Sequence, residues 1–307
     1  MNPLHLCGDA PDVPDLRGER IQTFAHGLAG HPLFSDESLE RLLDDYPRSH
    51  LHVTTMGRCF AEGGWRTGEV VGLRGSEILR AVRDGHLWLN IKYLHAVPEY
   101  AALTNALYEE IASRTGRRPP GWKATTLLVS SPGAFVHYHA DSVPNILWHL
   151  RGSKRVMVYP VRAPFAEPES LESICAGAKD EALAYDAAFE ADAQCVDLHP
   201  GQAVMWPQHS PHRVENRAGL NVSLSTEHMT PEVRRRVDVL RSNRVLRRLH
   251  LGPRSARSDG FGAYCKVGLA LLDRVLQRVR HRAPIHYRIP ATFRVDPNSP
   301  TGFHDLP

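Results

Sequence analysis

Apolar residues recur every three or four positions in three stretches near the start of the chain, a spacing that gathers them on one helix face. The predicted helices cover residues 38–45, residues 76–84 before Gly85, and residues 98–115 before Gly116. Ser35 or Asp36 can cap the first helix, and glycine is common directly after a helix end. Residues 1–20, rich in Pro, Gly and Asp, predict an irregular lead-in.

From Ala124 the pattern changes to short apolar runs separated by turn residues. Strands are predicted at residues 125–130, 135–139, 146–150, 155–159, 196–198, 203–206, 213–215 and 221–226, with a more helical insert at about 164–190. About eight short strands joined by tight turns predict a jelly-roll barrel. The expected fold class is therefore α+β, a double-stranded β-helix (jelly-roll barrel) with N-terminal helical elements and C-terminal helices.

Helical spacing returns after Pro231, first in a basic segment and then in a helix predicted over residues 266–282, before a tail expected to be irregular after Pro284. The basic segment holds Arg234, Arg235, Arg236, Arg241, Arg244, Arg247, Arg248, Arg254 and Arg257. Few aromatic residues are interleaved there, so a solvated helix face explains it better than nucleic-acid binding. The apolar stripe of the last helix can pack on the barrel or form a homodimer through the C-terminal helices.

These changes of pattern divide the chain into three segments. Residues 1–120 form an N-terminal α/β region that packs on the barrel, residues 121–230 the jelly-roll core, and residues 231–307 a basic helical region with a tail. The net charge of +3 is too mild to indicate a nucleic-acid partner. The five cysteines are scattered, and neither a signal peptide nor a membrane-spanning run is apparent, so we expect a reduced, cytoplasmic protein.

The candidate chemistry lies in the run from Val136 to Asp141. Alternate residues of a strand share a face, so His137, His139 and Asp141 are expected to point into the barrel if the strand stays extended. Two imidazoles and one carboxylate form the facial triad of non-haem Fe(II) oxygenases. His212, at the head of a later predicted strand, is the expected third ligand beside His139 and Asp141. His209 competes with it from the preceding loop.

Residues 120–228 resemble the JmjC/cupin-like 2-oxoglutarate oxygenases. The resemblance rests on His139-Ala140-Asp141, Asn145, the turn Gly152-Ser153-Lys154, Tyr159-Pro160, the turn Pro200-Gly201, and His212 with Val214-Glu215-Asn216. It implies that His139, Asp141 and His212 bind Fe(II) and are the catalytic centre, and that 2-oxoglutarate and O₂ are consumed. Lys154 would pair with the distal carboxylate of 2-oxoglutarate, and Asn145 would face the same pocket.

The family pattern often has a hydroxyl residue where this chain has Val136. Thr126, Ser130 or Tyr138 can replace it, and Asn221 and Ser223 are weaker pocket candidates. His137 is open as a ligand, a substrate contact or a residue behind the ligands.

The expected function is a 2-oxoglutarate-dependent hydroxylase of a protein side chain or small molecule. Two alternatives stay open. One is a 2-oxoglutarate-independent metal cupin using His137, His139 and His212, and the other is a non-catalytic regulatory or nucleic-acid-binding protein. Motifs of serine hydrolases, P-loop proteins and dinucleotide-binding proteins do not occur in the sequence.

Overall fold

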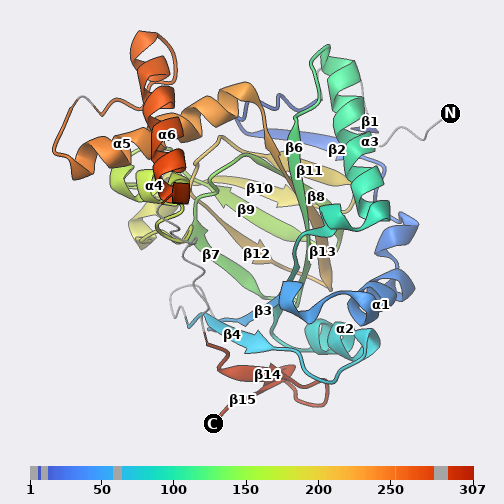
Figure 1. Ribbon diagram of the computed structural model, residues 1–307. Helices are drawn as coiled ribbons and strands as arrows, with labels where there is room; N and C mark the ends of the chain where they lie inside the picture. Colours follow the sequence, from blue (N-terminus) through green and yellow to red (C-terminus); the bar gives the residue numbers. More distant parts are fainter. Residues whose placement is uncertain (1–5, 8–12, 58–63, 253, 280–289) are drawn as a thin grey trace.

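The computed structural model describes residues 6–7, 13–57, 64–252, 254–279 and 290–307, and two sheets organise them (Figure 1). The larger sheet contains β1 (Leu6–Cys7), β2 (Gln22–His26), β3 (Leu51–Thr55), β4 (Arg66–Glu69), β5 (Trp88–Ile91), β6 (Trp122–Ser130), β8 (Asn145–Arg151), β11 (Gln202–Met205), β13 (Asn221–Met229), β14 (Phe293–Val295) and β15 (Phe303–Asp305). The smaller sheet contains β7 (Phe135–His139), β9 (Lys154–Val158), β10 (Gln194–Leu198) and β12 (His212–Asn216).

The strand order is non-sequential in both sheets. The larger runs β1-β2-β11-β8-β13-β6-β5-β3-β4-β14-β15 and the smaller β10-β9-β12-β7. Apolar side chains from both meet between them, including Leu147 and Val204 from the larger sheet and Val136, Val156 and Val214 from the smaller. The protein is therefore a mixed α+β jelly roll, and the predicted fold class is confirmed.

Helices cover the outer face of the larger sheet and one end of the molecule. They are α1 (Asp36–Asp45), α2 (Gly75–Asp84), α3 (Pro98–Thr115), α4 (Pro168–Cys175), α5 (Pro231–Arg248) and α6 (Phe261–Val279), with 3₁₀ turns η2 (Pro32–Phe34), η3 (Arg48–His50), η5 (Leu94–Ala96) and η6 (Ala187–Asp192). No helix in the described ranges has the length and apolarity needed to cross a bilayer.

Strand alternation explains why one sheet has two different apolar faces. Trp148 lies next to Leu147 in β8 and therefore points to the opposite face, where it is fully buried in the main core. Leu39 of α1, Ile78 of α2 and Leu107 of α3 belong to that same core. Helices α1 to α3 thus cover the outer face of the larger sheet and leave its inner face to line the barrel.

The structure has strands that the hydrophobic pattern did not predict. β2 to β5 lie in the N-terminal α/β region, where the pattern located only helices, and β14 and β15 lie in the tail expected to be irregular. β14 pairs with β4, where Gly68 leaves room for the ring of Phe293, since a Cβ at Gly68 would overlap it. The tail prediction was wrong because β14 is defined by pairing with β15 and with the distant β4, and not by an apolar pattern of its own.

The larger sheet includes strands from all three predicted segments: β2 from residues 1–120, β8 from residues 121–230 and β14 from residues 231–307. The last predicted helix begins earlier than expected, at Phe261, and is described as far as Val279. Its expected end, residues 280–282, and the tail up to residue 289 lie outside the described residues.

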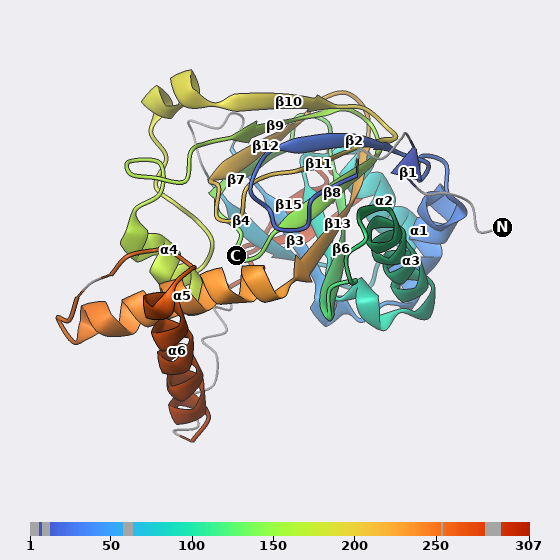
Figure 2. The ribbon, with the colours of Figure 1, turned by 90° about the horizontal axis from the view of Figure 1, so that it is seen from above.

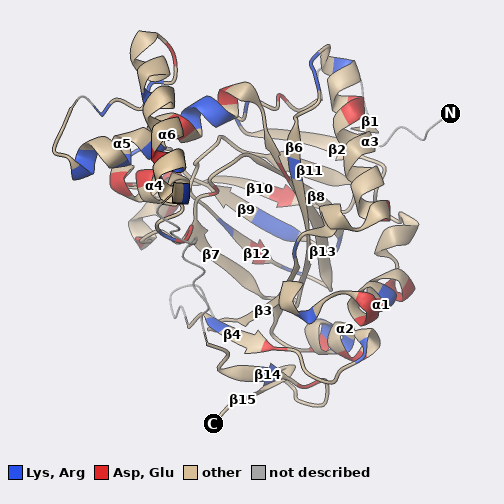
Figure 3. Ribbon diagram, in the orientation of Figure 1, with Lys and Arg blue, Asp and Glu red and all other residues tan. Residues whose placement is uncertain are grey.

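Helices α5 and α6 project from the barrel beside α4 (Figure 2). Figure 3 shows acidic residues of α4 beside the basic α5. Four of the nine arginines form ion pairs within the chain: Arg236 with Glu19, Arg241 with Asp273, Arg247 with Glu169 and Glu172, and Arg257 with Asp259. Arg236, Arg241 and Arg247 therefore connect α5 to other parts of the molecule, whereas Arg257 and Asp259 form an exposed local pair.

Candidate metal centre and adjoining cavity

Two adjacent strands bring the predicted ligands together. His139 ends β7, His212 begins β12, and these two residues are direct partners in the antiparallel pairing of the strands. Their ring centroids are 4.1 Å apart. Asp141, just beyond β7, places Oδ1 3.7 Å from Nε2 of His139 and Oδ2 3.6 Å from Nε2 of His212. All three donor atoms lie within 4.8 Å of one another, a spacing that suits one shared ion.

Hydrogen bonds fix both imidazole rings with the same nitrogen facing Asp141. Nδ1 of His139 lies 2.7 Å from the carbonyl oxygen of His137, and Nδ1 of His212 lies 3.0 Å from that of Ser210. A carbonyl only accepts, so each Nδ1 carries the proton and donates it. Each Nε2 therefore keeps a lone pair toward the centre of the group, the arrangement that metal-binding histidines use.

The electrostatics of the group favour a cation. Burial lowers the pKa of His139 to about 3 and that of His212 to about 4, so both rings are neutral near pH 7. Burial and the nearby Glu181 and Glu227 raise the pKa of Asp141. Asp141 accepts a 3.1 Å hydrogen bond from Nδ2 of Asn145, and no described lysine or arginine forms an ion pair with it. Two neutral nitrogens and an unpaired carboxylate fit a divalent metal of the Fe(II) type.

His137 does not lie where strict alternation along the strand predicts. The pairing of β7 with β12 shifts register between His212 and Val214, so two residues of β7, His137 and Tyr138, oppose the single residue Arg213 of β12. Because of this bulge, Val136 and His139 both line the inner cavity. His137 instead packs against Trp65, with ring centroids 5.1 Å apart, and lies outside the three-ligand group. His137 therefore does not line the cavity, although its ring centroid still lies 4.9 Å from that of His139.

His209, the competing candidate for the third ligand, faces a different part of the molecule. Its Nε2 lies 3.2 Å from the carbonyl oxygen of Ser142 and 3.3 Å from Sγ of Cys175 at the end of α4. It does not belong to the ligand group.

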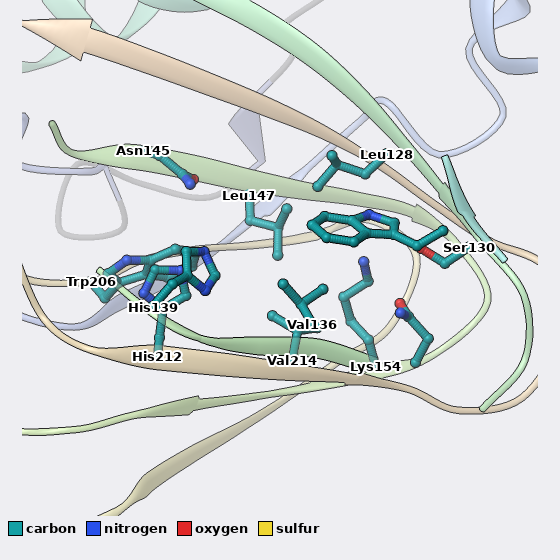
Figure 4. A pocket seen from close by; sticks show the side chains of 12 residues that line it. Leu128, Ser130, Val136, His139, Asn145, Leu147, Lys154, Trp206, His212 and Val214 are labelled. Atoms are coloured by element: carbon teal, nitrogen blue, oxygen red, sulfur yellow. The ribbon is translucent and has the colours of Figure 1, made fainter. Parts of the chain in front are cut away.

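A cavity of about 60 Å³, large enough for several water molecules, extends from the histidines into the barrel (Figure 4). His139 and His212 lie at one end, and Lys154 points into the cavity at the other. Leu147, Val136 and Val214 form apolar walls between them. One largely apolar cavity therefore connects the candidate metal site to the ammonium group of Lys154.

Lys154 is buried at the start of β9, and this burial lowers the pKa of its ammonium group to about 7. It has no hydrogen bond or ion pair with any residue that the structure describes. A buried ammonium without a partner is costly to the folded state. An anionic ligand in the cavity would remove that cost.

The other predicted pocket residues divide into two groups. Asn145 and Ser130 line the cavity, and Oδ1 of Asn145 is buried without a hydrogen-bond partner. The cavity lining does not include Thr126, Tyr138, Asn221 or Ser223. Ser223 Oγ lies 3.0 Å from Nδ1 of His149, and the Tyr138 hydroxyl donates to the Phe165 carbonyl. Among the three hydroxyl candidates, Ser130 is thus the one that faces the cavity.

Sequence reasoning missed several cavity residues, among them Trp88 and Asn216. Trp88 lies on β5, a strand that the pattern did not predict, and Asn216 ends β12 with its Oδ1 buried and unpartnered. Asn216 stood in the motif around His212, but nothing in its spacing indicated that it faces the cavity.

Fold and site together define a jelly-roll protein with a His-Asp-His group of metal-binding geometry. No family model and no curated protein matches the sequence. A solved structure of YcfD from Escherichia coli is similar: 14% identity, 89% of this chain and 69% of that chain covered, TM-score 0.52. Another solved structure is described as the ribosomal oxygenase YcfD from Escherichia coli in complex with cobalt and 2-oxoglutarate. It has 14% identity and a TM-score of 0.48, and the match covers 94% of this chain and 74% of that chain. At this identity the first likeness establishes the fold.

Proposed function

We propose that the chain is an Fe(II)- and 2-oxoglutarate-dependent hydroxylase, a dioxygenase of the JmjC/cupin-like type. One observation carries the proposal: a single cavity has a His-Asp-His group at one end and an unpaired, buried lysine at the other. When bound, Fe(II) and 2-oxoglutarate supply oxidative chemistry in which O₂ and 2-oxoglutarate are consumed and succinate, CO₂ and a hydroxylated substrate are formed.

Different residues of the chain would bind the metal and 2-oxoglutarate. His139, Asp141 and His212 would hold the metal through two Nε2 atoms and one carboxylate. Lys154 would pair with the far carboxylate of 2-oxoglutarate, with the Ser130 hydroxyl lining the same end of the cavity. The apolar walls exclude water, which strengthens each charge interaction inside. The unpartnered Oδ1 of Asn145 would accept a hydrogen bond from cosubstrate or substrate.

The substrate is a protein side chain or a small molecule. The description of YcfD as a ribosomal oxygenase belongs to that protein, and substrate-binding surfaces vary between proteins that share a fold.

We propose a cytoplasmic location for the protein. The free thiols of Cys175, Cys195 and Cys265 are compatible with that reducing compartment.

The isolated charge of Lys154 separates this proposal from a 2-oxoglutarate-independent cupin, which has no use for a buried cation. The test measures succinate released from 2-oxoglutarate, with Fe(II) and O₂ present. The wild type should release succinate, Asp141→Ala should release none, and Lys154→Ala should need a 2-oxoglutarate concentration at least ten-fold higher. A wild type that binds the metal but never consumes 2-oxoglutarate would rule out this function.

We also propose that the chain forms a homodimer through α6. Seven large apolar residues of this helix are exposed: Phe261, Tyr264, Leu271, Leu272, Val275, Leu276 and Val279. The face that α6 turns to α5 buries small residues, Ala263 and Ala270, and the ion pair of Arg274 with Asp238. Since α6 projects away from the barrel (Figure 2), a second copy can reach its apolar face.

A further inference from the structure

The two loops that carry Asp141 and His212 meet at one backbone atom, the carbonyl oxygen of Ser142. Gln208 Nε2 and His209 Nε2 both donate to this oxygen, each at 3.2 Å. Ser142 directly follows Asp141, and Gln208 precedes His212 by four residues. These two hydrogen bonds therefore connect the backbone of one ligand loop to side chains of the other.

Gln208 is itself held from the opposite side. Nη1 of Arg236, on α5, donates a 2.9 Å hydrogen bond to Gln208 Oε1 and a 2.6 Å bond to the carbonyl of Arg17. The backbone N–H of Gln208 donates to the carbonyl of Gly18 at 2.9 Å. The Gln208 side chain is buried, so its amide uses both its donor and its acceptor inside the protein. An unbroken path of hydrogen bonds thus runs from α5 through Gln208 to the residue beside Asp141.

The backbone of this loop is held in a conformation that it would not adopt freely. His209 has a φ of 68°, in the left-handed region that non-glycine residues rarely adopt. Its ring is buried between Ser142 and Cys175 of α4. Strained, buried conformations persist where surrounding contacts determine them, and they concentrate at functional sites.

We propose that Gln208 is a positioning residue that fixes the separation of the two ligand loops, and that Arg236 couples this clamp to α5. The inference rests on the proposed function, because it assumes that His139, Asp141 and His212 bind a metal. The amide is required because one end must accept from Arg236 while the other donates to Ser142. A carboxylate can accept from Arg236 but cannot donate to Ser142, and a thioether of similar length cannot donate and accepts only weakly.

The experiment compares Gln208→Glu, Gln208→Met and Arg236→Gln with the wild type. The matched control is Arg241→Gln, which removes another ion-paired α5 arginine whose partners, Asp273 and Gln277, lie on α6. Co(II) affinity is measured from its visible absorption, well below the melting temperature of each variant. Loss of hydrogen-bonded support behind metal ligands typically costs about 10- to 100-fold in affinity.

Both Gln208 variants should bind Co(II) about 10- to 100-fold more weakly, Arg236→Gln several-fold more weakly, and Arg241→Gln within two-fold of the wild type. Weak binding by Gln208→Glu distinguishes the donor to Ser142 from mere anchoring of α5, because this variant keeps a partner for Arg236. Wild-type Co(II) affinity in both Gln208 variants would overturn the role of Gln208 and would leave the proposed metal site standing. Failure of the wild type to bind Co(II) would overturn the proposed metal site and this inference with it. Should the Gln208 variants not fold, wild-type affinity in Arg236→Gln would overturn the coupling to α5.

Discussion

Lys154 has opposite effects on ligand binding and on the stability of the ligand-free protein. Its ordinary pKa of 10.5 falls to about 7 on burial, so the folded state holds this proton less tightly than the unfolded state does. The resulting cost is fully present below pH 7 and disappears as the pH rises toward 10.5. Lys154→Met should therefore stabilise the ligand-free protein by a few kcal/mol at pH 7, on the order implied by the shift.

Thermal unfolding at pH 7 checks this prediction, with Lys179→Met as the control because Lys179 is exposed. The control should leave the melting temperature unchanged. The same Lys154→Met protein should bind 2-oxoglutarate at least ten-fold more weakly than the wild type. A variant that is less stable than the wild type would indicate that Lys154 has a partner within the fold.

The affinity for 2-oxoglutarate should depend on pH through the same group. Only the ammonium form pairs with a carboxylate, so the affinity should be constant below pH 7 and fall by up to about ten-fold per pH unit above it. His139 and His212, with pKa values of about 3 and 4, stay neutral over this range and keep the metal bound. Calorimetric titration between pH 6 and 9 measures the trend. An affinity independent of pH would argue against Lys154 as the carboxylate partner.

The sequence predicted which residues meet at this site better than it predicted their orientation. His139 and Asp141 are neighbours in sequence, and the strand pattern placed His212 in the barrel. That Val136, and not His137, lines the cavity beside His139 could not be predicted, because the β7 bulge arises from pairing with β12, which a local pattern does not contain. The choice among Thr126, Ser130 and Tyr138 likewise needed the packing of β6 beside the cavity.

At the scale of elements, the turn between β8 and β9 positions Lys154. Gly152 in that turn has a φ of 79°, and a Cβ there would lie 2.8 Å from Cγ of Asn221. Gly133 has nearly the same φ, 78°, but a Cβ there would meet nothing within 4 Å. Alanine at either position incurs the left-handed backbone cost, whereas only Gly152→Ala adds the clash with Asn221.

Gly152→Ala should therefore destabilise the protein by about 1–3 kcal/mol more than Gly133→Ala does. It should also weaken 2-oxoglutarate binding, because the turn holds Lys154 in the cavity. Urea unfolding of both variants gives the comparison. Equal losses of stability would mean that Asn221 moves aside without cost.

Elements were predictable where one face is apolar and local signals mark the ends. α1 begins after Ser35, whose side chain accepts from the Ser38 N–H, and α3 ends at Gly116 with a φ of 66°. β4 and β14 escaped prediction because they are short and lie near the sheet edge, where pairing rather than pattern defines them. The fold class was still predictable, since the eight central strands carry their own apolar pattern.

At the scale of the whole molecule, the exposed face of α6 should determine the oligomeric state. The double variant Leu272→Glu with Val275→Glu should convert a dimer to a monomer, because charges replace the centre of the apolar face. Val71→Glu is the control, since Val71 is 51% exposed and Val275 53%, but Val71 lies far from α6 in sequence. Sedimentation velocity measures the mass. A monomeric wild type, or a double variant that stays dimeric, would contradict the proposed interface.

The metal site depends on individual residues, on elements and on the whole fold, because two paired strands and one loop must place three side chains around one ion. The most direct measurement is anaerobic Fe(II) titration with 2-oxoglutarate, monitored by the visible charge-transfer band of the ternary complex. The wild type and His137→Ala should bind one Fe(II) per chain and show the band, whereas Asp141→Ala and His212→Ala should show neither. A wild type without the band, or an Asp141→Ala variant that keeps it while His137→Ala loses it, would contradict the His139, Asp141 and His212 centre.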